Sequence, residues 1–108
     1  MEAVAIAPAG LLTAHTIGGY LDGMVAAYER VARAVRDEGT RLFVQLFHGG
    51  RELIAAAPRP VAVSASALPG HRYHTEPRAL STAEVQETIA AYAHCAAIAA
   101  RAGLDGTR

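Results

Sequence analysis

The sequence predicts an α/β fold in which helices cover a parallel β-sheet, and three observations support this prediction. A helical pattern over residues 22–38 leads through a short turn into a strand at 41–47. That strand is apolar on both faces, which is typical of a parallel sheet covered by helices on both sides. A long loop then leads to a second helical pattern at 82–102, so the order of elements is that of βαβ units.

Composition and charge argue against several classes of protein. The 108 residues allow one domain, residues 1–108, since typical domains have about 100–150 residues. Ten arginines balance ten acidic residues, and there is no lysine. Because the arginines are scattered along the chain, we expect neither nucleic acid nor an anionic membrane surface as a partner.

The expected location rests on one cysteine and on the distribution of apolar residues. Cys95 has no second cysteine to pair with, so no intrachain disulfide can form. No apolar run reaches about 18 residues, the length that a membrane-spanning helix needs. The apolar N-terminus lacks the basic segment of a signal peptide. We therefore expect a cytoplasmic protein.

The first third of the chain is expected to form a loop and then a helix. Residues 3–19 contain Pro and Gly without a sustained period, which predicts an irregular loop with a short extended piece. The helix over 22–38 has Asp22 as its expected N-cap. Gly39 fits the position just past the helix, where a positive φ is needed. The residues expected to face the core are Met24, Tyr28, Val31, Ala32 and Val35.

The predicted strand 41–47 reads RLFVQLF, and its successive side chains point to opposite faces of the sheet. Apart from Arg41 at its start, Gln45 is its only polar residue. The two faces consist of Leu42, Val44 and Leu46, and of Phe43, Gln45 and Phe47.

Residues 48–81 form a predicted loop that is rich in Pro and Gly. Structureless connections longer than about 12–15 residues are uncommon in compact domains unless they are functional. A loop that leaves the carboxyl end of a strand is where α/β enzymes build their sites. The alternative is a disordered linker.

The second helix, 82–102, has clear signals at both ends. Ser81 and Glu84 have the spacing of a capping box, in which each side chain bonds to the other residue's backbone. Gly103 is the expected left-handed residue past the helix, and Leu104 can supply the hydrophobic contact that accompanies it. Residues 104–108 then resemble the opening of another strand. The residues expected to face the core are Val85, Ile89, Tyr92, Ala96 and Ala99.

Gln45 is the best single candidate for binding a ligand. Its amide offers two donors and an acceptor, and leaving it unpaired in an apolar wall would cost about 1–3 kcal/mol. A heterocycle with adjacent carbonyl and ring N–H groups would match this amide. The alternative is a glutamine that pairs with a neighbouring strand.

Other polar residues give weaker signals. The run His48-Gly49-Gly50-Arg51 could bring the backbone and a cation close to an anion, although it matches no phosphate-binding fingerprint. His71 and His74, with His48 as a third ligand, could bind a metal, but solvated loop histidines are favoured.

A buried, inert thiol is favoured for Cys95. A nucleophilic pair of Cys95 with His94 is disfavoured, because adjacent helix residues do not face each other.

Several strings resemble the old yellow enzyme family of NADH:flavin oxidoreductases. RLFVQLFHGGRE resembles the third-strand motif of that family, Q-L-x-H-x-G-R. PRALSTAEVQETIAAYAHCAAIAARAGLDG is similar to its third barrel helix and the lead into strand four. EGTRLF and GLLTAH are similar to the turn after its second helix and to the loop after strand two. The sequence is nearest the bacterial branch that includes 2,4-dienoyl-CoA reductases.

The resemblance implies a partial TIM (β/α)8 barrel, from roughly the end of strand two through the start of strand four. Family members hold FMN at the carboxyl ends of their strands, accept hydride from NAD(P)H and reduce activated alkenes. The implied substrate is therefore an unsaturated carbonyl or enoyl compound. The motif glutamine, here Gln45, contacts the pyrimidine edge of the flavin. Ala3, which follows Glu2, matches a residue that contacts the flavin through its backbone.

The chain also departs from the family pattern. Thr107 stands where the motif G-x-D-G-V-E-I-H has valine, and the histidines that grip the substrate would follow strand four. Because a complete barrel takes about 250 residues, we expect a fragment that is inactive alone, with unpaired strand edges that favour self-association. The alternative function is a non-enzymatic α/β module that oligomerises or binds a partner through an open sheet edge.

Overall fold

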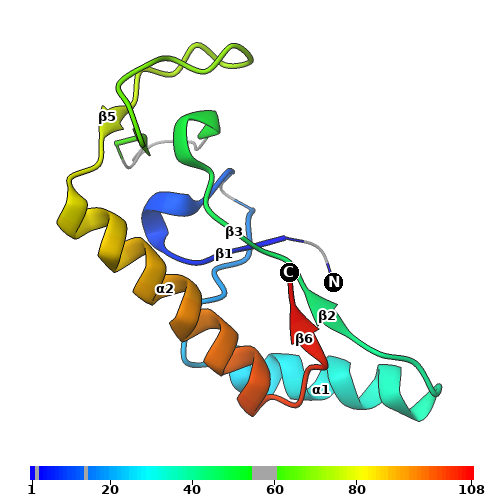
Figure 1. Ribbon diagram of the computed structural model, residues 1–108. Helices are drawn as coiled ribbons and strands as arrows, with labels where there is room; N and C mark the ends of the chain where they lie inside the picture. The colour runs from blue at the N-terminus through cyan, green and yellow to red at the C-terminus, as the bar shows by residue number, and fades with distance from the viewer. Residues whose placement is uncertain (2, 14, 55–60) are drawn as a thin grey trace.

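Two helices and a set of short strands make up the computed structural model, which describes residues 1, 3–13, 15–54 and 61–108. The helices are α1 (Met24–Asp37) and α2 (Thr82–Arg101), and the 3-10 turns are η1 (Pro8–Gly10) and η2 (Gly50–Glu52). The strands are β1 (Val4–Ala5), β2 (Phe43–Val44), β3 (Leu46–Phe47), β4 (Val63–Ser64), β5 (Arg78–Ala79) and β6 (Gly106–Thr107). The chain is elongated, with extents of 46 × 26 × 22 Å, and its two termini lie near each other beside β6 (Figure 1).

β2 and β3 are consecutive pieces of one strand, and this strand lies between β1 and β6. β1 pairs with β3 in parallel, and β6 pairs with β2 in parallel. The pairing partner changes at Gln45, which separates the two pieces. The predicted strand is therefore confirmed over residues 43–47. A stagger between neighbouring parallel strands is expected in a barrel.

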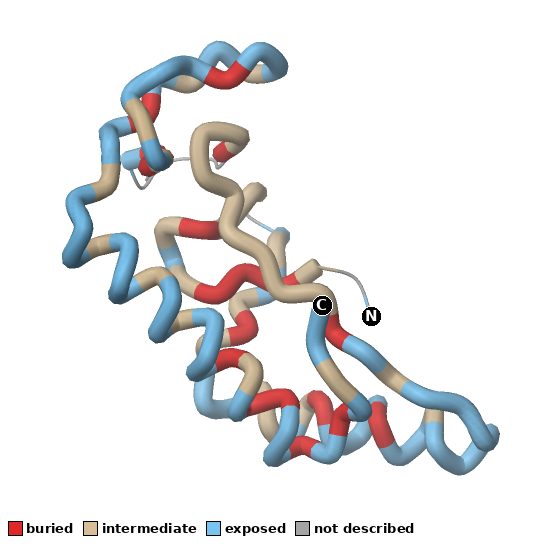
Figure 2. The backbone as a smooth tube through the Cα atoms, in the orientation of Figure 1, coloured by how far each residue is buried: buried red, intermediate tan, exposed pale blue. Residues whose placement is uncertain are grey.

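The main core lies between one face of this strand and the two helices. Val44 is fully buried there, and Leu42 and Leu46 pack against the cluster. Buried residues gather where the two helices and the strands meet (Figure 2). The buried members of the cluster are Val4, Tyr28, Ala32, Val44, Ile98, Ala99, Ala102 and Leu104. The opposite face is more open, since Phe43 is 44% exposed. The predicted alternation is confirmed, whereas the predicted burial of both faces holds for one face of this chain.

The start of α1 differs from the prediction. Gly23 is the N-cap, and no side chain caps the helix. Leu21 O already accepts from Met24 N (2.9 Å), and Gly23 has right-handed helical dihedral angles. Asp22 therefore lies in the turn that precedes the helix, too early to cap it.

On α1 the predicted core face is right at Tyr28 and Ala32, which are buried, and wrong at Val31, which is exposed. Gly39 has a φ of +73°, as predicted.

The packed face of α2 is rotated from the predicted one. Val85, Ile89 and Tyr92 are exposed, and of the predicted residues only Ala99 is fully buried. The buried residues of the helix are Cys95, Ile98 and Ala99. Small side chains let a helix approach its neighbours closely, so in an alanine-rich helix the largest side chains do not mark the packed face.

The ends of α2 follow the prediction. Ser81 Oγ accepts from Glu84 N (3.3 Å), and Glu84 Oε2 accepts from Ser81 N (2.8 Å), which completes the capping box. Gly103 has a φ of +73°, and Leu104 is buried. The strand expected after Leu104 is β6.

Between β3 and α2, the residues that the structure describes form only short elements. Two residues separate η2 from β3, and β4 pairs with β5 in parallel (Val63 with Arg78). Residues 55–60, part of the predicted loop, lie outside the described residues. Within the described ranges, neither helix is long and apolar enough to span a membrane.

Tyr28 yields a test of the core. Its ring is buried, but its hydroxyl has no hydrogen-bond partner among the described residues, and burial raises its pKa, as does the nearby Cys95 thiol to a smaller extent. An orphaned buried hydroxyl costs about 1–3 kcal/mol. We expect Tyr28→Phe to unfold at an equal or higher temperature than the unmodified chain in a thermal melt.

Tyr92→Phe, at an exposed position on α2, is the matched control and should leave the melting temperature unchanged. A loss of stability confined to Tyr28→Phe would show that the hydroxyl has a partner.

Candidate functional site

The open face of the central strand carries a row of three residues. Val4 pairs with Leu46, and Val44 pairs with Thr107. Extending the two registers by one residue places Ala3, just before β1, and Arg108, just after β6, on either side of Gln45. Since side chains alternate along a strand and Val44 and Leu46 pack against the helices, this row faces away from them. Ala3 and Gln45 are half-buried, and Arg108 is exposed.

Arg108 contacts the Gln45 amide through one weak hydrogen bond. Its Nη2 donates to Gln45 Oε1 over 3.5 Å. A guanidinium has only donors, so the amide oxygen faces Arg108 and the two amide hydrogens face elsewhere. The backbone of Gln45 is held on its other edge, where Gln45 O accepts from Val4 N (2.8 Å). The structure thus supplies part of the pairing that the amide requires, and among the described residues no acceptor meets its hydrogens.

Arg108 is the member of this row that the sequence did not reveal. Its place beside Gln45 follows from the register of β2 with β6, and no local pattern encodes that register. Glu2, the residue before Ala3, lies outside the described residues.

His48 and its glycines form a tight turn after β3. Gly50 N donates to His48 Nδ1 (3.0 Å), so the neutral ring carries its proton on Nε2. A Cβ at Gly10 would lie 3.0 Å from His48 Cδ2, and Gly50 has a φ of +57°, so both positions favour glycine. Burial lowers the pKa of His48.

Two cavities flank this turn. The smaller, of about 210 Å³, is lined by His48 together with residues of β4, β5 and α2. The larger, of about 590 Å³, lies against η2 and is lined by Leu12, Arg51, Glu52, Gly70, His71, Arg72 and Tyr73. The sequence pointed to Arg51 and His71 separately, and both line the larger cavity.

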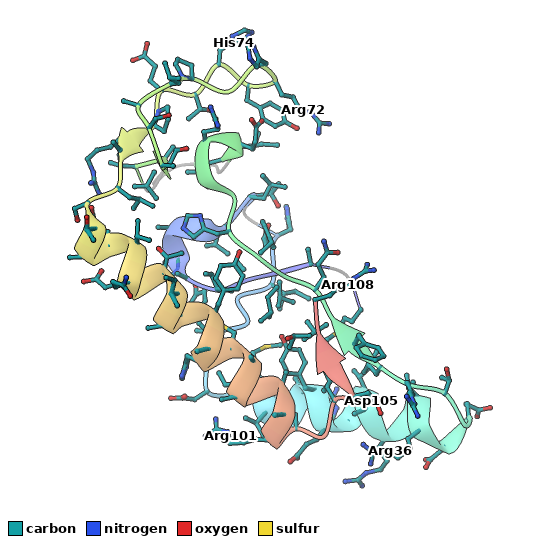
Figure 3. The ribbon with its side chains drawn as sticks, viewed as in Figure 1. Arg36, Arg72, His74, Arg101, Asp105 and Arg108 are labelled. Atoms are coloured by element: carbon teal, nitrogen blue, oxygen red, sulfur yellow. The ribbon has the colours of Figure 1, made fainter. Side chains whose placement is uncertain are left out.

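The structure does not support the metal hypothesis for His48, His71 and His74. Across the described residues, no three His, Cys, Asp or Glu side chains could together hold a metal ion. His48 and His71 line different cavities, and His74 lies in the same loop as His71, near Arg72 (Figure 3).

The structure also separates Cys95 from His94. Cys95 is buried and its Sγ donates to Ile6 O (3.6 Å), whereas His94 is exposed. Burial raises the pKa of the Cys95 thiol, which makes the reactive thiolate scarce. The predicted burial of the Cys95 thiol is confirmed, and its inertness stays a prediction.

An exposed ion pair braces the start of α2. Arg78 Nη1 donates to Glu84 Oε2 (3.0 Å), the same oxygen that accepts from Ser81 N. Hydrogen bonds from Arg78 and then from Ser81 lower the pKa of Glu84 to about 2. These contacts hold the helix terminus and contribute no free group to a site.

The comparisons with known proteins agree with this geometry. The model of the NADH:flavin oxidoreductase / NADH oxidase family matches residues 1–108. The chain belongs to this family. It is the family of the old yellow enzymes, and the resemblance carried by RLFVQLFHGGRE is confirmed.

Relatives of this old yellow enzyme segment are reductases and dehydrogenases. It is 28% identical to an NADPH dehydrogenase of Bacillus velezensis over 105 residues, covering 97% of this chain and 30% of that protein. It is 38% identical to a chanoclavine-I aldehyde reductase of Penicillium roqueforti over 97 residues, covering 86% of this chain and 26% of that protein.

A solved structure, morphinone reductase in complex with tetrahydroNAD, superimposes with a TM-score of 0.86 at 29% identity. The match covers 97% of this chain and 34% of that one. The chain therefore spans about a third or less of the length of these relatives. Its fold is that of an α/β-barrel segment, as predicted, and its family is that of NAD(P)H-dependent flavin oxidoreductases. The expected placement near 2,4-dienoyl-CoA reductases stays a prediction.

The His48 turn makes stability depend on pH. The pKa of His48 is lower in the folded chain than its usual value of about 6.5, so its contribution to stability is present above that pH and is lost as the pH falls through the lower folded value. We expect the free energy of unfolding to fall between pH 7 and 5 more steeply for the unmodified chain than for His48→Asn, whose amide oxygen can replace Nδ1 as acceptor.

His94→Asn, at an exposed position on α2, should follow the unmodified chain. Parallel pH curves for the unmodified chain and His48→Asn, measured by urea unfolding, would contradict this assignment.

Proposed function

We propose that this chain supplies the flavin-contacting strands, from the end of strand two through the start of strand four, of an FMN-dependent NAD(P)H oxidoreductase. The substrate class is an activated C=C bond in an unsaturated carbonyl or enoyl compound. One observation carries the proposal, namely the row of Ala3, Gln45 and Arg108 on the open face of the sheet. The names of the relatives, which include an NADPH dehydrogenase and an aldehyde reductase, support the reaction class.

The residues of this row fit one edge of a flavin. The pyrimidine edge presents two carbonyl oxygens with a ring N–H between them, and these oxygens need donors. Gln45 has amide hydrogens that Arg108 does not use, and Arg108 has further guanidinium hydrogens. Ala3 has only a methyl side chain on this face, so it leaves room for a planar ring above the strand.

The chain's own contribution is to bind and orient. The flavin, when bound, supplies the hydride transfer, and the protein determines where the ring lies. Gln45 would fix the ring edge by donating hydrogen bonds, and Arg108 would hold the amide in the orientation that allows this. The charge of Arg108 would also favour an electron-rich ring edge over a neutral one.

Titration of the purified chain with FMN, followed by flavin fluorescence, tests this role. We expect Gln45→Glu, which keeps the shape but loses both amide hydrogens, to weaken FMN binding about tenfold, the cost of one or two hydrogen bonds. Gln86→Glu, at an exposed position on α2, is the matched control. Equal affinities for the chain and Gln45→Glu would contradict the assignment of Gln45.

The same preparation tests activity. The chain spans 30% of the Bacillus velezensis relative, and a complete barrel takes about 250 residues. We propose that the isolated chain has no turnover, so it should oxidise NAD(P)H no faster than free FMN does. A stoichiometric yellow chromophore that turns over with NAD(P)H and an enone would overturn this claim.

A second candidate function, a non-enzymatic module that self-associates, rests on the open face and the outer edge of the sheet. Phe43 is 44% exposed on that face, and β6 pairs on one edge with β2 and with no second strand among the described residues. The outer edge of β1 is already bridged by Gly18. Unpaired strand edges are templates for pairing with another chain. Size-exclusion mass measured with and without FMN separates the two functions. A single oligomer that is indifferent to FMN would favour the module, and a monomer that FMN stabilises would favour the flavoprotein.

A further inference from the structure

The cleft against η2 lies apart from the Ala3, Gln45 and Arg108 row and has a distinct set of polar walls. Its volume of about 590 Å³ is within the range of small-molecule sites, about 300–1,000 Å³. It is formed by the turn at Arg51 and Glu52, by the loop from Gly70 to Tyr73, and by Leu12. Three segments that are distant in sequence therefore converge on one space.

The walls carry more positive than negative charge. Arg51 and Arg72 line the cleft, with the His71 imidazole between them in sequence. Across the described ranges neither arginine forms a salt bridge, and the recorded hydrogen bond of Arg51 is one weak donation to Leu68 O (3.4 Å). Since a guanidinium has five N–H donors, most of this capacity is left for a ligand. Two such groups in one cleft match the oxygens of phosphate groups.

An aromatic surface lies beside these cations. The Arg72 guanidinium stacks over the Tyr73 ring, 5.1 Å from its centroid. This contact orders the side chain of Arg72, which is otherwise exposed in the loop (Figure 3). A stacked aromatic and guanidinium pair also presents a flat surface to a planar base.

Glu52 adds an acceptor that lacks a donor. Its Oε2 is shielded from solvent and has no hydrogen-bond partner among the described residues. Gly70 covers this carboxylate so closely that a Cβ there would lie 2.6 Å from Oε1. Oε1 of the same carboxylate lies beside Gly70, and Glu52 is half-buried and lines the cleft, so a ligand hydroxyl entering there would meet Oε1. Carboxylates bind ribose hydroxyls in this way in dinucleotide sites.

We propose that this cleft binds the adenosine-phosphate end of a nucleotide ligand. Arg51 and Arg72 hold its phosphates, Glu52 accepts a ribose hydroxyl, and Tyr73 lies beside the base. This inference deepens the proposed function and rests on it for the source of the ligand. Both a nicotinamide dinucleotide reductant and an acyl-CoA substrate carry an adenosine-phosphate end.

Calorimetric titration of the chain with three probes tests the proposal. ADP-ribose represents the reductant, adenosine 3′,5′-bisphosphate represents coenzyme A, and inorganic pyrophosphate is the bare anion. We expect one of the two nucleotides to bind more tightly than pyrophosphate, and the tighter nucleotide identifies the source. Arg51→Gln and Arg72→Gln should each raise the Kd of that nucleotide about tenfold, the effect of losing one charge-assisted hydrogen bond.

Arg101→Gln is the matched control, because Arg101 lies at the other end of the molecule from Arg72 (Figure 3). Glu52→Gln should reduce the preference for the nucleotide over pyrophosphate. If Arg51→Gln fails to fold, as a thermal melt would show, Arg72→Gln still tests the site, because Arg72 is exposed.

Binding of pyrophosphate as tight as that of either nucleotide, an equal loss in Arg101→Gln, or no binding by any probe would overturn the proposal. None of the probes contains nicotinamide or flavin. If these probes do not bind, the assignment of Gln45 is unaffected. If FMN does not bind, the proposal for this cleft still depends only on the titrations with these probes.

Discussion

The hydrogen-bonded ladder on both edges of residues 43–47 is the constraint on which the rest of the structure depends. On one edge Val4 N and Ile6 N donate to Gln45 O and Phe47 O, at 2.8 and 3.1 Å. On the other edge Arg108 N donates to Val44 O (3.0 Å). Because parallel pairing fixes register and the side-chain period is two, this ladder decides which residues face the helices and which face away. The row that contains Gln45 is a consequence of backbone pairing between segments more than 40 residues apart.

The helices hold the ladder through small side chains and through polar links at one end of the sheet. Cys95 and Ala99 let α2 approach the strands closely, and Ile98 fills the space beside Val44. Below them, Asp105 Oδ2 accepts from Leu42 N (2.8 Å), and Arg36 donates to Gly103 O (2.7 Å). The hydrogen bonds of Asp105 and Arg36 thus lie at the amino ends of the strands, on the side where the helices pack. The carboxyl ends lead into loops with His48, Arg51 and Glu52, which is the division expected of an α/β enzyme.

The sequence predicted those features whose causes are local. The capping box at Ser81, the positive φ at Gly39 and Gly103, and the alternation along residues 43–47 depend on residues close in sequence, and all are confirmed. The errors have non-local causes. Val85 and Ile89 are large and apolar, yet the helix packs through Cys95, Ile98 and Ala99, because what matters is the fit to the strands. The position of Arg108 beside Gln45 depends on strand register. The position of Arg72 in the cleft with Glu52 depends on how the loop folds back. No local sequence pattern encodes either.

On the open face, the position of Gln45 and the strength of the hydrogen bonds it can donate have different causes. This chain fixes where the backbone of Gln45 lies through the ladder, and Arg108 contacts the amide oxygen over 3.5 Å. The strength of a hydrogen bond from that amide depends on its surroundings, because water competes for the same donors and the net gain falls to about 0.5–1.5 kcal/mol. In a covered, low-dielectric interior the same bond is stronger. With Phe43 44% exposed, the face is still wet. A short segment can therefore carry the geometry of the proposed flavin site while most of the affinity depends on whatever covers that face.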